Sequence, residues 1–296
     1  MTTLSNCPCC NGSSFEPYIS CKDYTVSQET FQIVSCKTCS FKFTNPRPAE
    51  DKIGDYYKSE SYISHSNTSQ GLISKLYKAV RNYTLKGKLK LISKHSQKGN
   101  LLDYGCGIGM FLSVARSSTW NAFGIEPDPG ARDFATKENK ITRVYPDVKT
   151  ANENLADVQF NCITLWHVLE HVMDLNETLT WFNKKLNSGG ALIIAVPNYT
   201  SFDAQTYKEF WAAYDVPRHL YHFDQRTMVE LVQKAGFKHI ESLPMKFDSF
   251  YVSMLSEKYK TGSISYPKAF LTGLRSNLKA KEAKDYSSVI YVFKKP

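Results

Sequence analysis

The stretch LLDYGCGIGMF (residues 101–111) constrains the fold of this chain more than any other. It places Gly105, Gly107 and Gly109 at alternate positions, directly after an apolar run that contains Asp103. Glycine reaches backbone conformations that other residues avoid, and it lets a ligand approach the main chain. A glycine-rich turn between a buried strand and a helix is typical of α/β proteins that bind a nucleotide-like cofactor.

After residue 99 the sequence alternates between apolar, strand-like runs and stretches of helical periodicity, which predicts a parallel sheet covered on both faces. Helices are expected at 108–117, 128–138, 174–187 and 227–236. One or two more are expected at 71–98. Seven strands are predicted, of which the last two form an antiparallel edge: 100–105, 121–127, 141–145, 160–166, 191–197, 239–245 and 287–293.

The spacing of the glycines argues against a dinucleotide. A dinucleotide loop reads G-x-G-x-x-G, but here the third glycine comes one residue early and Met110 takes its place. Asp103 would also repel a pyrophosphate placed on the loop. A cofactor with a cationic end fits better, and S-adenosylmethionine carries an ammonium and a sulfonium but no phosphate.

Together, four segments resemble the motifs of class I S-adenosylmethionine-dependent methyltransferases over residues 100–296. They are LLDYGCGIGMF, FGIEP, CITLWHVLEHV and LNSGGALIIAVPN. The resemblance implies a Rossmann-like α/β sheet, and it implies that Gly105, Gly107 and Gly109 lie against the cofactor. Asp103 would face its methionine end, and the Glu126 carboxylate would accept both ribose hydroxyls.

Two further cofactor contacts are less strictly placed by the resemblance. The family often has an acid after the third strand that binds the adenine amino group, and Asp147 is the nearest match. Trp166 follows the fourth strand and can pack on the cofactor, although a core tryptophan would give the same pattern. We expect both to be cofactor contacts.

Cys7, Cys10, Cys36 and Cys39 form two Cys-x-x-Cys pairs near the N-terminus. Two such pairs supply the four thiolates of a tetrahedral, structural zinc site with no open position. Cys9 could compete with Cys10 for the metal. We expect a zinc-ribbon-like module that unfolds when the metal is removed, because so short a segment has too small a core of its own.

Histidines are the natural bases at neutral pH. His167 and His171 follow the fourth strand, and His171 is expected to be structural. His219 and His222 lie in DVPRHLYHF, a long aromatic and charged segment that can form a lid. His219, beside Arg218, is the first candidate to contact substrate, with His167 and His222 as further catalytic candidates. The sequence shows no acid-rich set to complete a catalytic metal site.

The chain carries a formal net charge of +9. Residues 71–98 hold eight Lys or Arg and no acid, and residues 246–296 hold ten and four acids. Such basic segments suit an anionic partner or simply form solvated helix faces. No apolar run approaches a membrane span, and the N-terminus lacks a signal-peptide pattern. We therefore expect a cytoplasmic protein; the sequence does not indicate its oligomeric state.

Three functions remain open. The first is methyl transfer to a small molecule, because chains that join a zinc ribbon to lids like PRHLYHF resemble bacterial enzymes of cell-surface sugar or secondary metabolism. The second is an RNA methyltransferase with basic flanks, although the near-neutral zinc segment argues against it. The third is a non-catalytic binding protein, which the intact glycine loop argues against.

The sequence predicts three segments, of which the last has four parts. Residues 1–44 are the zinc-ribbon-like module and 45–70 a linker that wraps the surface. Residues 71–296 are the methyltransferase domain. Within it, 71–98 form basic helices, 99–197 the cofactor-binding core, 198–224 the lid and 237–296 the C-terminal strands.

Overall fold

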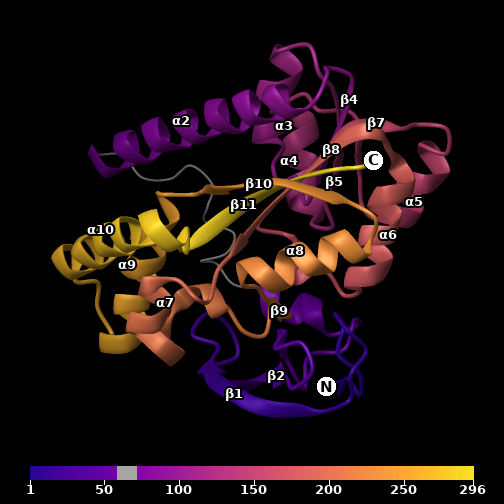
Figure 1. Ribbon diagram of the computed structural model, residues 1–296. Coiled ribbons are helices and arrows are strands. Elements are labelled where there is room, and N and C mark those ends of the chain that lie inside the picture. Colours follow the sequence, from indigo (N-terminus) through magenta and orange to yellow (C-terminus); the bar gives the residue numbers. More distant parts are fainter. Residues whose placement is uncertain (59–71) are drawn as a thin grey trace.

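The computed structural model describes residues 1–58 and 72–296, which form two sheets (Figure 1). All neighbours in the larger sheet are parallel except β11, which runs antiparallel to both β10 and β8. This confirms the predicted seven-stranded α/β sheet with an antiparallel edge. From edge to edge its strands are β10 (Lys238–Pro244), β11 (Ser288–Lys294), β8 (Leu186–Pro197), β7 (Phe160–Trp166), β4 (Asn100–Tyr104), β5 (Asn121–Ile125) and β6 (Val144–Tyr145).

Helices cover both faces of this sheet. Successive residues of a central strand enter different cores: Leu101 packs with α2 and α3, whereas Leu102 packs with α6 and α8. This explains why the strands read as continuous apolar runs. The helices that surround the sheet are α2 (Leu72–His95), α3 (Met110–Ser117), α4 (Pro129–Lys137), α5 (Val148–Asn154), α6 (Leu175–Lys185) and α8 (Gln225–Lys234).

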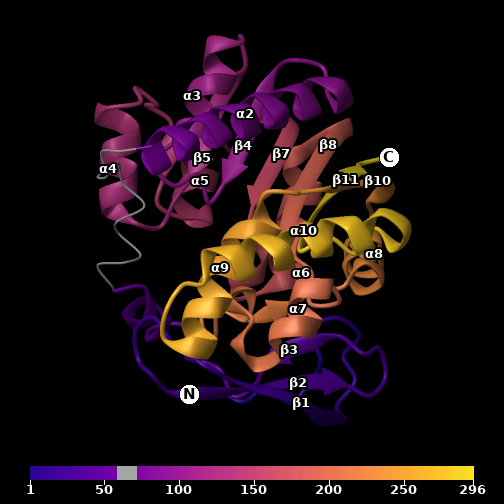
Figure 2. The same ribbon diagram turned by 90° about the vertical axis from the view of Figure 1, so that its left-hand side faces the viewer.

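The smaller sheet joins the N-terminal module to a segment far along the chain (Figure 2). Its order is β1 (Phe15–Lys22), β2 (Thr30–Cys36), β3 (Lys42–Thr44) and β9 (Tyr221–His222). In the pairing of β3 with β9, Lys42 lies opposite His222 and Phe43 opposite Tyr221. The cysteine-rich module therefore shares a sheet with the end of the segment predicted to be a lid.

The rest of that segment is mostly buried and built from short helices. It contains α7 (Phe202–Tyr207) and the 3-10 helices η3 (Lys208–Phe210) and η4 (Ala212–Tyr214). Two further 3-10 helices are η1 (Ile53–Tyr57) and η2 (Leu169–His171). Of the predicted linker 45–70, residues 59–70 lie outside the described residues.

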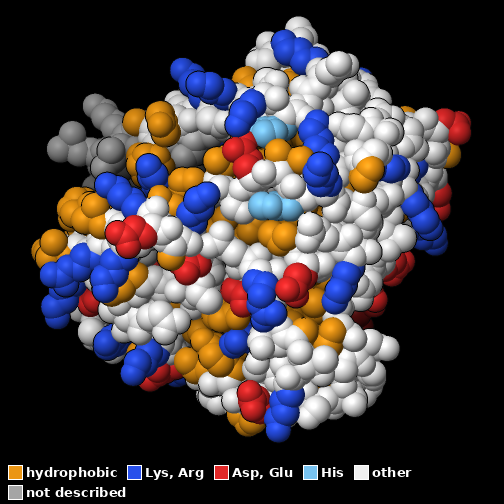
Figure 3. All heavy atoms as spheres, in the orientation of Figure 1, with side chains coloured by type: hydrophobic (Ala, Val, Ile, Leu, Met, Phe, Trp, Pro, Cys, Tyr) orange, Lys and Arg blue, Asp and Glu red, His pale blue; other side chains and the backbone are white. Residues whose placement is uncertain are grey.

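Two helices between β10 and β11 were not predicted from the sequence: α9 (Asp248–Thr261) and α10 (Tyr266–Ala283). Their buried faces are made of small or polar residues, such as Ser253, Gly273 and Ser276, while Phe270 and other large apolar side chains are exposed. Figure 3 shows apolar and basic side chains intermingled on this side of the molecule. Among the described residues, no helix has the length and apolarity needed to cross a membrane.

Candidate functional site

The glycine loop connects β4 to α3 at the carboxyl end of the sheet. The backbone N–H groups of Gly105 and Cys106 both donate to the carbonyl of Ile125, which fixes the loop on β5. Gly105 has a φ of +72°, and a Cβ there would lie 2.5 Å from Val168. Gly109 has a φ of +75°, and its Cβ would lie 3.0 Å from Ala135. Packing and backbone conformation therefore both require these two glycines.

Gly107 differs from its two neighbours. Its φ is +52°, yet a Cβ built on it would meet no atom of the described residues within 4 Å. Its N–H donates to Glu126 Oε2 at 2.8 Å. The open space beside this backbone is where a ligand can approach the loop, and a side chain would fill it.

Glu126 lies immediately after β5, as predicted, and its carboxylate turns toward the loop. Besides the bond from Gly107, its Oε1 accepts the N–H of Asp128 at 3.0 Å. Burial raises the pKa of Glu126, although these backbone hydrogen bonds favour the charged form. The carboxylate is thereby held at the loop with a defined orientation.

Asp103 is buried at the end of β4, where it is 3% exposed and accepts a hydrogen bond from Thr164 Oγ1 at 2.7 Å. Burial raises the pKa of Asp103 to about 7, against the opposing influence of Thr164 and of the Lys88 ammonium. A carboxylate in this position is well suited to stabilise a cationic group nearby.

Lys88 of α2 is a charged neighbour that the sequence analysis missed. Its Nζ lies 4.2 Å from the ring centroid of Trp166, at the end of β7. Burial lowers the pKa of Lys88, whereas the nearby carboxylates of Asp103 and Asp248 raise it. The sequence did indicate a buried charge here, because Lys88 lies between Leu85 and Ile92 on the apolar face of its helix. The Trp166 ring also packs edge-on against Phe111.

Asp147 lies after β6, as predicted, but its side chain is used locally. It is the N-cap of α5 and accepts the N–H of Thr150 at 2.7 Å. This hydrogen bond lowers the pKa of the exposed carboxyl group. Its contact with adenine stays a prediction.

His167 directly follows β7 and has a φ of +59°. Its Nε2 lies 2.9 Å from Asp248 Oδ2, and its Nδ1 lies 3.4 Å from Glu170 Oε1. Burial opposes the imidazolium, but the two carboxylates prevail and raise the pKa of His167 to about 10. This histidine is therefore a cation and a hydrogen-bond donor at neutral pH.

His219 and His222 are buried, at 8% and 4% exposure. Burial, together with the neighbouring His171, holds the pKa of His219 well below its usual range. Burial lowers the pKa of His222 to about 3. His222 Nε2 lies 3.2 Å from the Thr44 hydroxyl of the N-terminal module. Both rings are neutral; their catalytic roles, like that of His167, stay predictions.

The structure brings His171 and His219 together, with ring centroids 4.5 Å apart. Glu170 lies beside them, fully buried. From the sequence, His171 was expected to be structural, and Glu170 was not among the candidate residues. The pairing of η2 with the lid segment, through the N–H of Leu220 and the carbonyl of Glu170, could not be read from local spacing.

The four predicted metal-ligating cysteines converge. The Sγ atoms of Cys7, Cys10, Cys36 and Cys39 all lie within 4.8 Å of one another. Two of the pairs are 3.6 Å and 3.5 Å apart. Four thiolates at about 2.3 Å from a zinc ion would be separated by about 3.8 Å. The donor set and its spacing therefore fit tetrahedral zinc.

Comparisons with known proteins are consistent with this architecture. A model of a family described as "Methyltransferase domain" matches residues 77–242. No curated protein sequence matches the chain.

Solved structures resemble the chain at low identity. Phosphoethanolamine N-methyltransferase 2 of Haemonchus contortus, in complex with S-adenosyl-L-methionine, is 15% identical, with 96% of this chain and 69% of that chain covered and a TM-score of 0.53. Magnesium protoporphyrin IX methyltransferase of Synechocystis, with bound SAH, is 11% identical, with 84% and 100% covered and a TM-score of 0.53. At these identities the likeness shows the fold alone.

Proposed function

Because this chain belongs to the methyltransferase domain family, we propose that it transfers a methyl group from S-adenosylmethionine to a small-molecule acceptor. The observation that carries the cofactor assignment is the open space beside Gly107, bordered by the Glu126 carboxylate. A backbone with positive φ and no side chain lets a ribose approach, and the carboxylate can accept its hydroxyls.

The residues around the loop fit the other parts of this cofactor. Asp103 supplies a buried negative charge for the methionine ammonium, and the Lys88 ammonium can bind the methionine carboxylate. Trp166 offers an aromatic surface beside them. Asp147 is proposed to contact the adenine amino group. A pyrophosphate would be repelled by Asp103 and Glu126, so the same charges disfavour a dinucleotide.

The cofactor supplies a methyl group that its sulfonium already activates, so the chain mainly has to orient the acceptor. The acceptor forms a bond to the methyl carbon as the carbon–sulfur bond breaks, and the bonding electrons remain on sulfur. We propose that His219 faces the acceptor group with its Nε2 atom. His167, a cation held between Asp248 and Glu170, contributes positive charge there, and His222 supports the wall of the site through Thr44 of the module.

A small acceptor, such as a sugar or another cell-surface or secondary metabolite, is favoured over RNA. His219 and His222 belong to the buried lid segment, which is joined to the N-terminal sheet, and a site walled by this segment suits a small substrate. On the face drawn in Figure 3, basic side chains are interspersed with acidic and apolar ones. A nucleic-acid site would be expected to present a continuous basic surface.

The acceptor class can be tested with methyl-labelled S-adenosylmethionine. The protein is incubated separately with a bacterial small-molecule extract and with purified total RNA, and the transferred label is counted. We expect label in the small-molecule fraction alone. Label in RNA, with a steep dependence on salt, would contradict the small-molecule assignment and support the RNA alternative.

The affinity for S-adenosylmethionine should depend on pH through Asp103. The raised pKa, about 7, means that the carboxyl is protonated below neutral pH and ionised above it. A cationic cofactor favours the ionised form, so affinity should be full above pH 7. It should weaken by up to about tenfold for each pH unit below that. Calorimetric titrations across this range check the profile.

Asp103→Asn is the control for this pH dependence. The variant should bind more weakly at high pH, and its affinity should change much less between pH 5 and pH 8. A wild-type profile that is flat over this range, or one that persists unchanged in the variant, would remove Asp103 from the site.

We also propose that Cys7, Cys10, Cys36 and Cys39 hold a structural zinc ion and that the protein is cytoplasmic. The N–H of Cys9 points to Cys7 Sγ and that of Gly12 to Cys10 Sγ, both at 3.4 Å. Such bonds stabilise thiolates. All eight cysteines are free thiols, as a reducing compartment would keep them.

Removing the zinc should unfold the module and also loosen the lid, because β3 is the partner strand of β9. Chelation should therefore abolish amide-exchange protection in residues 1–44 and reduce it around 215–223. Strands β4 and β7 should remain protected, since α2 and α3 cover one of their faces in a core that contains no module residue. Unchanged exchange after complete metal removal, or protein purified without zinc, would contradict this proposal.

A further inference from the structure

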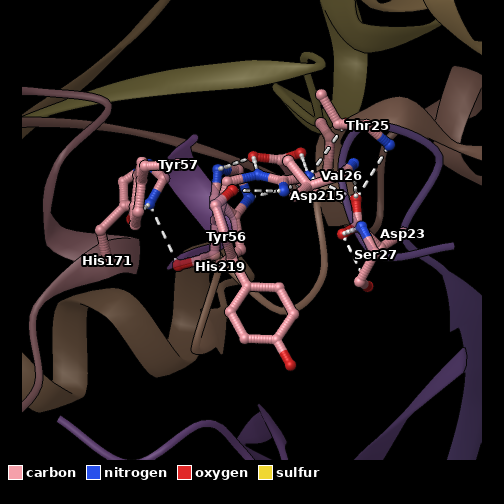
Figure 4. Close-up of polar contacts among 11 residues, drawn as sticks. Asp23, Thr25, Val26, Ser27, Tyr56, Tyr57, His171, Asp215 and His219 are labelled. Carbon is pink, nitrogen blue, oxygen red and sulfur yellow. Dashed lines mark hydrogen bonds and ion pairs between the residues drawn. The ribbon is translucent and has the colours of Figure 1, made fainter. Parts of the chain in front are cut away.

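We propose that Glu170, His171 and His219 bind a second metal ion, a divalent transition metal, at the acceptor side of the site. One ligand atom of each residue lies within 4.8 Å of the other two. Two residues come from η2 after β7 and the third from the lid segment. Figure 4 shows His171 and His219 close together, with Tyr57 beside His171.

The hydrogen bonds of the two imidazoles leave the same atom available on each ring. His171 Nδ1 lies 3.1 Å from the carbonyl oxygen of Arg218, and His219 Nδ1 lies 2.9 Å from that of Ala213. A carbonyl can only accept, so we assign the proton to Nδ1 in both rings; the Tyr57 hydroxyl oxygen, 2.9 Å from His171 Nδ1, then accepts from the same N–H. Each Nε2 therefore has a free lone pair. Metal-binding histidines are commonly oriented in this way, by a backbone carbonyl on the other nitrogen.

Glu170 provides an independent observation. Its side chain is fully buried, and neither carboxylate oxygen has a hydrogen-bond partner among the residues that the structure describes. His167 Nδ1 lies 3.4 Å from Glu170 Oε1, but that ring also pairs with Asp248 at 2.9 Å. A buried carboxylate without hydrogen bonds is unfavourable, and coordination of a cation would satisfy it.

Two imidazoles and one carboxylate suit Zn²⁺ or Mn²⁺, and they leave coordination positions open. An open position distinguishes this site from the four-thiolate site, which is closed. His171 is only half-buried, so an oxygen ligand can approach the ion from its side.

The role of the ion rests on the proposed function. An acceptor hydroxyl bound to it would lose its proton to water more readily, because the ion stabilises the alkoxide. The oxygen would then form its bond to the methyl carbon as the carbon–sulfur bond breaks. The acceptor class is thus an alcohol, and one with a second oxygen nearby could chelate the ion.

The test uses the full chain with zinc already in the four-cysteine site. Mn²⁺, which prefers oxygen and nitrogen ligands to thiolates, is titrated in, and the free ion is followed by electron paramagnetic resonance. We expect one Mn²⁺ per chain. Absence of Mn²⁺ or additional Zn²⁺ binding to this wild-type protein would overturn the proposal.

Substitutions then locate the site. Glu170→Gln and His219→Asn should each weaken Mn²⁺ binding at least about 100-fold, because each removes a direct ligand. Exposed Glu177→Gln and partly exposed His239→Asn are matched controls and should leave Mn²⁺ affinity unchanged. Wild-type affinity in Glu170→Gln would also overturn the assignment, since a buried ion pair with His167 would then explain the cluster.

Two further measurements distinguish failure of the metal proposal from failure of the proposed function. S-adenosylmethionine affinity, measured on the same samples, tests the cofactor site without reference to Mn²⁺. If the variants that lack a metal ligand do not fold, adding Co²⁺ to zinc-loaded wild-type protein still tests whether the second metal site exists. A second site should give d–d absorption without thiolate charge-transfer bands, and thiolate bands alone would contradict it.

Discussion

Replacing Gly107 with alanine is expected to weaken the binding of S-adenosylmethionine at least about 100-fold, or roughly 2.7 kcal/mol. Within 4 Å the added methyl group meets no atom of residues 1–58 and 72–296, so it enters the space assigned to the cofactor. The positive φ of +52° adds backbone strain. That strain costs about 1–2 kcal/mol of folding stability. Calorimetry gives the affinity, and denaturant unfolding gives the stability.

Gly189→Ala is the matched control. Gly189 has a φ of +73°, and its Cβ would also meet nothing within 4 Å in the described part of the chain, but it lies near the start of β8, away from the loop. Both variants should lose a similar amount of stability, and only Gly107→Ala should lose the cofactor. Equal affinities in the two variants would mean that the cofactor does not approach this loop.

Replacing Arg218 with methionine is expected to lower the free energy of unfolding by about 3–5 kcal/mol. Arg218 is 1% exposed and connects the lid to the N-terminal module. Its Nη2 lies 2.7 Å from Asp215 Oδ1 and 3.0 Å from Asp23 Oδ1. Methionine fills part of the volume but leaves the buried carboxylate of Asp23 without its counter-charge. Figure 4 shows Asp23 and Asp215 converging from the two parts of the chain.

Denaturant unfolding of zinc-loaded protein measures this loss. Arg275→Met, on the exposed face of α10, is the control and should change stability by no more than about 0.5 kcal/mol. The double variant Arg218→Met/Asp23→Asn should recover part of the loss, because it removes the unpaired charge. If Arg218→Met were as mild as the control, the network would not hold the lid to the module.

The sequence predicted the parts of the fold that local patterns encode. The central strands alternate between two cores, so their apolar runs were visible, and the glycine loop marked the strand-to-helix turn. Helices α9 and α10 were missed because their buried faces carry Ser253, Ser256 and Gly273, while Phe270 and Leu271 are exposed. Apolar periodicity marks a helix only where apolar residues form its buried face.

Sequence motifs predicted only part of the candidate site. Glu126 and the four cysteines lie where their spacing placed them. The contacts of Lys88 with Trp166, and of His171 with His219, join segments far apart in the sequence, and only the tertiary structure brings them together. The pairing of β9 with β3 of the module likewise joins segments far apart in the sequence. Through this pairing, the position of the lid depends on residues 42–44.

The central claim is that the open space at Gly107 and Glu126 binds S-adenosylmethionine. Calorimetric titration of the zinc-loaded wild-type protein with this cofactor at pH 8 tests it most directly. We expect one binding site per chain, together with a marked loss of affinity in Glu126→Ala that exceeds any loss of folding stability. Absence of binding to folded, zinc-loaded protein would contradict the claim.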